Sequence, residues 1–246
     1  MTTTQETGST SNVTVLLVHG AFAESASWNP VISQLRARSV EVVAVANPLR
    51  SVSGDAAYLR DVITGIGTPV VLVGHSYGGM VITEAAAGND AVVGLVYVAA
   101  FAPGQGESAL ELSNKFPGST LGDTLLTSPV PGGGTEFRIR PEAFHRQFVA
   151  DGSQAEAELM AVTQRPVAEA ALVEGLPTAD PAWTQRPSWF VFGDQDRNIP
   201  VEALRFMAER AGSKGTREVA GGSHAIGVGA PDEVAASILD AVGSAR

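Results

Sequence analysis

The sequence predicts an α/β protein, with a mostly parallel β-sheet, helices on both faces and a helical cap inserted into the sheet region. Two observations predict this architecture. Apolar, β-branched runs alternate with amphipathic segments of helical spacing, as in parallel sheets that are covered on both faces. The alternation stops near residue 102 and resumes near residue 184, and the stretch between them is rich in Gly and Pro.

The N-terminal part of the chain contains four expected strands. Residues 13–18 read Val-Thr-Val-Leu-Leu-Val, which is apolar on both faces and ends in His-Gly. The other expected strands are 40–46, 69–73 and 92–99, and the helices between them are 28–38, 56–66 and 80–87. Because strands and helices of these lengths alternate, we expect right-handed crossovers and a parallel sheet.

Residues 102–183 show no strand of the parallel type, but they contain two segments with helical spacing, 142–150 and 154–172. We interpret this stretch as a cap that lies over the carboxyl edge of the sheet. Regular elements then return as a strand at 188–192, a helix at 201–211, a strand at 216–219 and a helix at 231–242, with Pro231 in its first turn. The predicted division is a mobile tail (1–11), a core (12–101 and 184–246) and a cap (102–183).

The composition excludes several classes of protein. A net charge of -10 without a basic stripe disfavours nucleic acids and anionic membrane surfaces as partners. The absence of cysteine excludes disulfides, thiolate zinc sites and cysteine nucleophiles. The polar N-terminal residues lack the pattern of a signal peptide, and no apolar run is long enough to span a bilayer, so we expect a cytoplasmic protein.

The motif Gly-His-Ser-Tyr-Gly at residues 74–78 follows an apolar strand and precedes a helical segment. This strand–turn–helix context is typical of a nucleophile elbow, in which a tight, strained turn holds a serine above the sheet. The glycines occupy positions where the adjoining strand and helix leave no room for a Cβ atom. Ser76 is therefore the predicted nucleophile.

A serine nucleophile needs a base, and the chain has four histidines. His19 and His75 lie beside glycines at strand ends, where local packing or hydrogen bonds would hold them. His145 lies on a cap helix and is better explained as a solvent-facing or hydrogen-bonded residue. His224 lies in a short Gly-Gly-Ser-His loop at the edge where ligands of α/β proteins bind, and it is the predicted base.

The third member of the triad should follow a strand between the nucleophile and the base in sequence. Asp194 and Asp196 both follow the strand that ends at Phe192. Asp196 lies further into the loop and can turn towards the edge of the sheet, so we favour it. Asp194 can instead cap the turn or pair with Arg197.

An acyl-transfer intermediate needs two backbone N–H donors for its oxyanion. Tyr77, the residue after the nucleophile, is expected to supply one. The other should come from the loop after the first strand, where Ala21 is favoured and Phe22 is the second candidate.

Together these motifs resemble the α/β-hydrolase superfamily. They are Val-His-Gly-Ala-Phe at 18–22, Gly-His-Ser-Tyr-Gly-Gly at 74–79, Gly-Asp-Gln-Asp-Arg-Asn-Ile-Pro at 193–200 and Gly-Ser-His-Ala at 222–225. The chain is most similar to small bacterial esterase-like members related to plant methylesterases and hydroxynitrile lyases, from about residue 13 to residue 242. The resemblance implies the α/β-hydrolase fold, the triad Ser76, Asp196 and His224, and an oxyanion hole formed by Ala21 and Tyr77.

One position departs from the hydroxynitrile lyases of plants, which carry a lysine directly after the catalytic histidine. Ala225 stands there in this chain. The serine at the elbow also disfavours dehalogenases and epoxide hydrolases, which use an aspartate at that position.

The expected function is that of a serine carboxylesterase, which cleaves small to medium apolar esters through an acyl-enzyme. The alternatives are a hydroxynitrile lyase-like or other carbon–carbon lyase activity, and a non-catalytic protein that binds a small molecule. The triad implies no metal and no organic cofactor. The expected partner is a small-molecule ester, and a homodimer is compatible with this interpretation.

Overall fold

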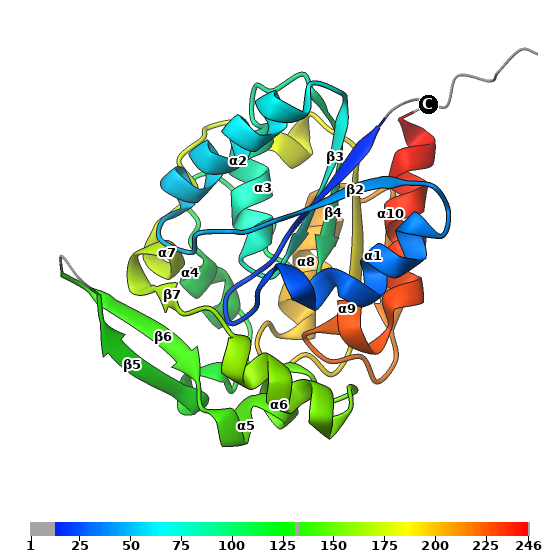
Figure 1. Ribbon diagram of the computed structural model, residues 1–246. Coiled ribbons are helices and arrows are strands. Elements are labelled where there is room, and N and C mark those ends of the chain that lie inside the picture. Colours follow the sequence, from blue (N-terminus) through cyan, green and yellow to red (C-terminus); the bar gives the residue numbers. More distant parts are fainter. Residues whose placement is uncertain (1–12, 131–132, 246) are drawn as a thin grey trace, which may run out of the picture.

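The computed structural model describes residues 13–130 and 133–245, and its largest sheet has six parallel strands in the order β2-β1-β3-β4-β8-β9 (Figure 1). The strands are β1 (Thr14–Val18), β2 (Glu41–Val45), β3 (Val70–His75), β4 (Val92–Val98), β8 (Ser188–Gly193) and β9 (Gly215–Val219). Every neighbouring pair in this sheet is parallel. The predicted α/β fold class is therefore confirmed.

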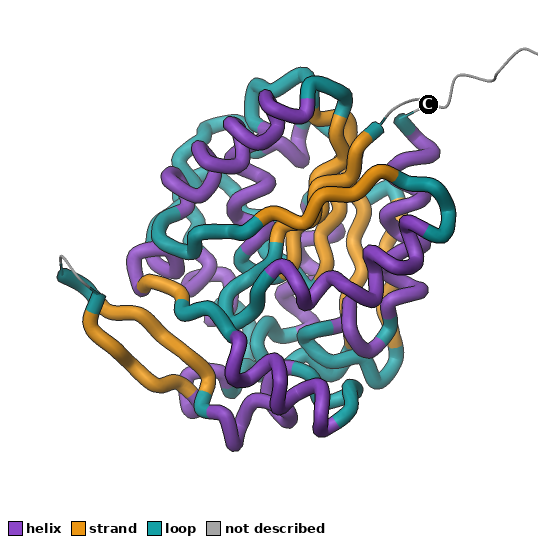
Figure 2. Tube along the Cα trace, viewed as in Figure 1, coloured by secondary structure: helices purple, strands orange, loops and turns teal. Residues whose placement is uncertain are grey.

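Two pairs of helices cover opposite sides of this sheet, as Figures 1 and 2 show. On one side, α1 (Asn29–Arg36) packs against α10 (Pro231–Ser244), and on the other α2 (Val52–Ile66) packs against α3 (Gly78–Ala86). Helix α8 (Val201–Arg210) packs against β8. Because both faces are covered, β3 is buried along its whole length, which explains its continuous apolar sequence.

Local sequence signals set the ends of several helices. The Ser51 side chain accepts a hydrogen bond from the Gly54 N–H at the start of α2. Gly67 ends α2 in the left-handed conformation (φ 71°) that glycine adopts without a steric penalty. Pro231 lies in the first turn of α10, as predicted.

The elements between residues 109 and 173 lie towards one end of the large sheet, whereas the last residues of the segment 102–183 run back beside α3 (Figure 1). The segment contains a small antiparallel sheet in the order β5-β6-β7, which Figure 2 shows apart from the parallel sheet. The elements are α4 (Ala109–Asn114), β5 (Leu125–Pro129), β6 (Thr135–Ile139), α5 (Pro141–Phe148), α6 (Gln154–Thr163), β7 (Val167–Ala168) and α7 (Glu169–Val173). The sequence analysis did not predict the hairpin of β5 and β6.

The single helix predicted over residues 154–172 is wrong beyond Thr163. Helix α6 ends at Thr163, and β7 and α7 follow it as separate elements. Pro166 explains the break, because a proline lacks an N–H donor and forces the preceding residue out of the helical region. The freed segment pairs instead with β6, where Val167 lies opposite Phe137.

One of the sequence predictions, the mobile tail at 1–11, falls outside the described residues. Among the residues that are described, no helix is long and apolar enough to cross a membrane.

Candidate active site

Ser76 follows the last residue of β3 in a strained conformation with φ 54°, which non-glycine residues rarely adopt. The neighbouring chain comes very close to this turn. A Cβ atom on Gly20 would lie 2.6 Å from the Ser76 Cβ, and one on Gly74 would lie 2.6 Å from the Gly78 carbonyl oxygen. The glycines thus allow the loop after β1 and the start of α3 to pack around Ser76.

His224 and Asp196 form a buried hydrogen-bonded pair. The His224 Nδ1–H donates to Asp196 Oδ2 over 2.7 Å, and both side chains are almost fully buried. The second carboxylate oxygen of Asp196 accepts the N–H groups of Asn198 at 2.8 Å and Ile199 at 3.0 Å. These bonds fix the carboxylate, and they leave the Nε2 atom of a neutral His224 free of its proton and able to act as a base.

The backbone around His224 is held by residues from β3 and from the segment 102–183. The His75 Nε2–H donates to the His224 carbonyl over 3.0 Å, and the two rings lie 4.8 Å apart. Burial and the neighbouring His224 lower the pKa of His75 well below its usual range, so His75 is a neutral donor.

Hydrogen bonds from the segment 102–183 also hold the residues directly before and after His224. Asp151 accepts hydrogen bonds from both the N–H (3.0 Å) and the hydroxyl of Ser223. The Phe148 carbonyl accepts the N–H of Ala225 at 2.8 Å. The end of α5 and the turn that follows it therefore fix the loop that carries His224.

Two buried backbone N–H groups next to Ser76 are available to a ligand. Among the hydrogen bonds of the described residues, none uses the N–H of Ala21 or Tyr77, although both residues are buried. Buried N–H groups are almost always paired in folded proteins, so two free ones beside the same serine indicate a site for an acceptor oxygen. The Phe22 N–H is likewise unused there.

The side chain of Tyr77 is fixed by an unexpected partner. Its hydroxyl donates to Asp55 Oδ2 over 2.8 Å, and Asp55 also accepts the Arg50 N–H. Burial raises the pKa of the Asp55 carboxyl, and the hydrogen bonds from Arg50 and Tyr77 oppose this change. Burial and the Asp55 charge raise the pKa of the Tyr77 hydroxyl, so it remains a donor.

Ser76, Ala21 and Tyr77 line one cavity of about 150 Å³, which we call the catalytic cavity. Most of its other walls are apolar and come from the core loops and from segment 102–183; they include Phe101, Leu121, Leu125 and Leu172. Within the described part of the chain no hydrogen bond joins the Ser76 hydroxyl to the His224 ring, although His75, which directly precedes Ser76, contacts that ring.

The remaining polar candidates have other partners. Asp194 accepts the Gly221 N–H at 2.7 Å, which leaves Asp196 as the aspartate that contacts His224. His19 bonds to the Gly20 carbonyl at 2.9 Å and accepts the Asn47 N–H at 3.1 Å. His145 contacts the Gly152 carbonyl at 3.0 Å. None of these three residues lines the catalytic cavity, and neither do His224 and Asp196.

The sequence analysis missed two contributors to this site, Asp55 and Asp151. Only Asp55 could have been found from the sequence. It lies four residues before Leu59 and eight before Ile63, so the helical period places it on the apolar face of α2. The contact of Asp151 with Ser223 spans 72 residues, which no local pattern reveals.

Comparisons with known proteins agree with this architecture. The family model described as "Alpha/beta hydrolase family" matches residues 15–237. The curated protein "Alpha/beta hydrolase nvfD" from Aspergillus novofumigatus (strain IBT 16806) is 34% identical over 113 residues, which are 38% of this chain and 45% of that protein. The match therefore spans less than half the length of that relative.

Solved structures match nearly the whole chain. Polyneuridine aldehyde esterase has a TM-score of 0.79 at 23% identity, with 93% of this chain and 98% of that one covered. A pyrethroid hydrolase from Sphingobium faniae JZ-2 has a TM-score of 0.73 at 20% identity, with coverage of 94% and 98%. A point mutant of tomato methylketone synthase I has a TM-score of 0.79 at 18% identity, with coverage of 96% and 99%.

At these identities the structural likeness shows the fold alone, whereas the family model covers most of the chain. The predicted superfamily is thus confirmed. The chain belongs to the alpha/beta hydrolase family.

Proposed function

We propose that this protein is a serine carboxylesterase for small to medium apolar esters. The observation that carries the proposal is the buried 2.7 Å hydrogen bond between Asp196 and His224, at the same edge of the sheet as the strained Ser76. An aspartate bonded to Nδ1 orients a histidine so that its other nitrogen can take a proton from a serine hydroxyl.

In the proposed mechanism Ser76 Oγ attacks the ester carbonyl carbon while His224 Nε2 takes the hydroxyl proton. The N–H groups of Ala21 and Tyr77 stabilise the negative oxygen of the tetrahedral intermediate. His224 then gives its proton to the leaving alcohol, and the acyl group remains on Ser76. A water molecule, deprotonated by His224, attacks the acyl-enzyme and releases the acid.

The mostly apolar lining of the catalytic cavity favours an apolar substrate. A cavity of only about 150 Å³ favours esters with short acyl chains. We propose that residues 102–183 act as a cap that closes this cavity, because Leu121, Leu125 and Leu172 line it. The names of two similar structures, an esterase and a pyrethroid hydrolase, also favour hydrolysis.

The proposal is tested by turnover of p-nitrophenyl esters from acetate to octanoate. We expect the wild type to be active on the shorter esters, and Ser76→Ala to lose at least about 10³-fold in kcat, as loss of a triad nucleophile does. Ser33→Ala, at an exposed serine on α1, is the matched control and should keep full activity.

Equal activity in the wild type and Ser76→Ala would exclude Ser76 as the nucleophile. Inactivity of the wild type on all esters would instead favour a lyase or a binding protein. Release of cyanide from mandelonitrile tests the first of these two alternatives.

A further inference from the structure

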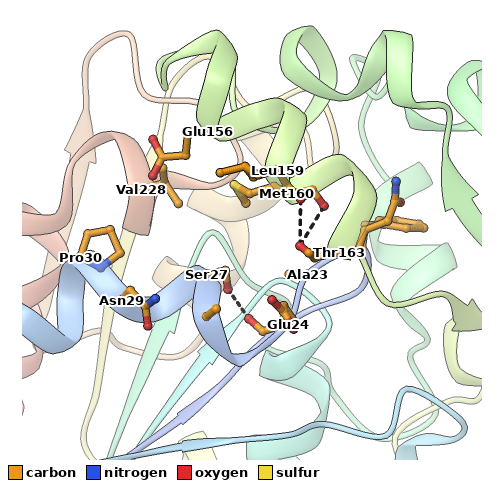
Figure 3. Close-up of a pocket in the computed structure, with 13 residues that line it drawn as sticks. Ala23, Glu24, Ser27, Asn29, Pro30, Glu156, Leu159, Met160, Thr163 and Val228 are labelled. Atoms are coloured by element: carbon orange, nitrogen blue, oxygen red, sulfur yellow. Dashed lines mark hydrogen bonds between the residues drawn. The ribbon is translucent and has the colours of Figure 1, made fainter.

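A second, larger cavity lies beside the catalytic one. It has a volume of about 380 Å³ and lies between helix α6 and the loop and helical turn at residues 22–30. Figure 3 shows Leu159 and Met160 on the side of α6 that faces this segment, with Val228 and Pro30 towards one end. We call it the outer cavity.

Phe22 is the one described residue that lines both cavities. It is only 3% exposed, and its backbone is in the left-handed region with φ 60°. It directly follows Ala21, which lines the catalytic cavity together with Ser76 and has an unused N–H. Phe22 is therefore the residue at which the two cavities adjoin.

The lining of the outer cavity indicates which ligands fit it. Seven of its lining residues are apolar, among them Met160, Val228 and the largely exposed Leu159, and six are polar, including the carboxylates Glu24 and Glu156. In the described part of the chain neither carboxylate forms a salt bridge. Two uncompensated acids disfavour an anionic ligand such as a free fatty acid, and apolar walls favour a neutral hydrocarbon chain.

We propose that the outer cavity is a second substrate subsite, and that Phe22 determines substrate size by controlling access to it. The ligand of this subsite is the neutral apolar chain of an ester too long for the catalytic cavity. The inference rests on the proposed esterase function, since it assumes that the reacting carbonyl lies beside Ser76.

The test is the ratio of kcat/KM for p-nitrophenyl octanoate to that for the acetate. We expect Phe22→Ala to raise this ratio at least tenfold, because it joins the two cavities. Adding Met160→Trp, which fills the outer cavity, should return the ratio to the wild-type value. Phe22→Leu should give an intermediate ratio, and it replaces Phe22→Ala if the latter does not fold.

Phe116→Ala is the matched control for a general loosening of the cap. Phe116 packs against Phe206 and lines neither cavity, so its loss should leave the ratio unchanged. An unchanged ratio in Phe22→Ala would overturn the proposal. So would a raised ratio that survives the addition of Met160→Trp, because the chain would then lie elsewhere.

A binding measurement separates this inference from the proposed function. In the Ser76→Ala background, calorimetry with decan-2-one should show at least tenfold tighter binding when Phe22→Ala is added, and loss of that gain with Met160→Trp. This pattern in a protein whose wild type cleaves no ester would support the subsite and reject the esterase. Ester cleavage without this pattern would reject the subsite alone.

Discussion

At the residue scale, the most informative contact is the hydrogen bond from Tyr77 to Asp55. The Tyr77 N–H is the proposed oxyanion donor, and the 2.8 Å bond from its hydroxyl ties the other end of the residue to helix α2. Oxyanion stabilisation depends on donors that are already in place when charge develops. Asp55 is thus proposed to position Tyr77 without touching the substrate.

The substitution Tyr77→Phe removes the hydrogen bond to Asp55 and keeps the backbone N–H donor of residue 77. We expect kcat on p-nitrophenyl acetate to fall about tenfold, less than the roughly 10²–10³ lost when a donor is deleted, with KM little changed. The free energy of unfolding should fall by about 1–3 kcal/mol, because the buried Asp55 loses a donor.

Tyr97→Phe is the matched control for this substitution. Its hydroxyl is also buried and pairs with that of Thr83 at 2.8 Å, and neither residue lines the catalytic cavity. It should destabilise the protein similarly but leave kcat intact. If both variants keep wild-type kcat, the role of Asp55 is structural only.

At the scale of elements, the site is assembled from two parts of the chain that are distant in sequence. The strands β1, β3 and β8 end at one edge of the sheet and supply Ala21, Ser76 and Asp196. The turn between α5 and α6 supplies Asp151, which holds Ser223 next to His224. The segment 102–183 thereby contributes to the position of the proposed base as well as to the walls of the cavity.

Asp151→Ala should therefore impair turnover although Asp151 lines neither cavity. We expect a loss of about tenfold in kcat from a less well-positioned His224, since a misplacement of about 1 Å can cost about 10²-fold. Kinetics on p-nitrophenyl acetate, together with thermal unfolding, measure this effect. Asp180→Ala, at an exposed loop aspartate, is the control, and equal kcat in both variants would contradict the proposed role of Asp151.

At the scale of the whole molecule, two buried histidines, His19 and His75, are neutral and lie at the ends of the central strands β1 and β3. Burial lowers the pKa of His19 from 6.5 to about 4, and it lowers that of His75 as well. His19 accepts the Asn47 N–H and thereby ties the loop after β1 to the end of β2. Protonation of His19 would remove that acceptor.

Because the pKa of His19 is lower in the folded state than in the unfolded one, its contribution to stability is present above pH 6.5 and lost as the pH falls towards 4. The loss should approach roughly 3 kcal/mol in the free energy of unfolding. Urea unfolding between pH 7 and pH 4 measures it.

His19→Gln should make this pH dependence shallower than in the wild type. The same carboxyl groups titrate in both proteins, so the difference in slope isolates His19. Equal slopes for His19→Gln and the wild type would contradict the assignment.

The sequence by itself determined the parallel sheet and supplied the candidate residues of the site. Strand periodicity and short motifs are local, and a buried strand such as β3 needs a continuous apolar run wherever it lies in the fold. The same locality explains why Ser76 and His224 could be named from their flanking glycines. Their catalytic roles, and the boundaries of the cap, remain predictions.

Only the tertiary structure shows which of the two aspartates contacts His224. Asp194 accepts the Gly221 N–H and Asp196 accepts the His224 ring N–H, a difference of direction and not of chemistry. It also placed the hairpin of β5 and β6 in a stretch with weak periodicity. The position of Phe22 between two cavities and the contacts of Asp151 with Ser223 depend on packing between segments far apart in sequence. Such contacts have no local pattern, and the fold alone brings them together.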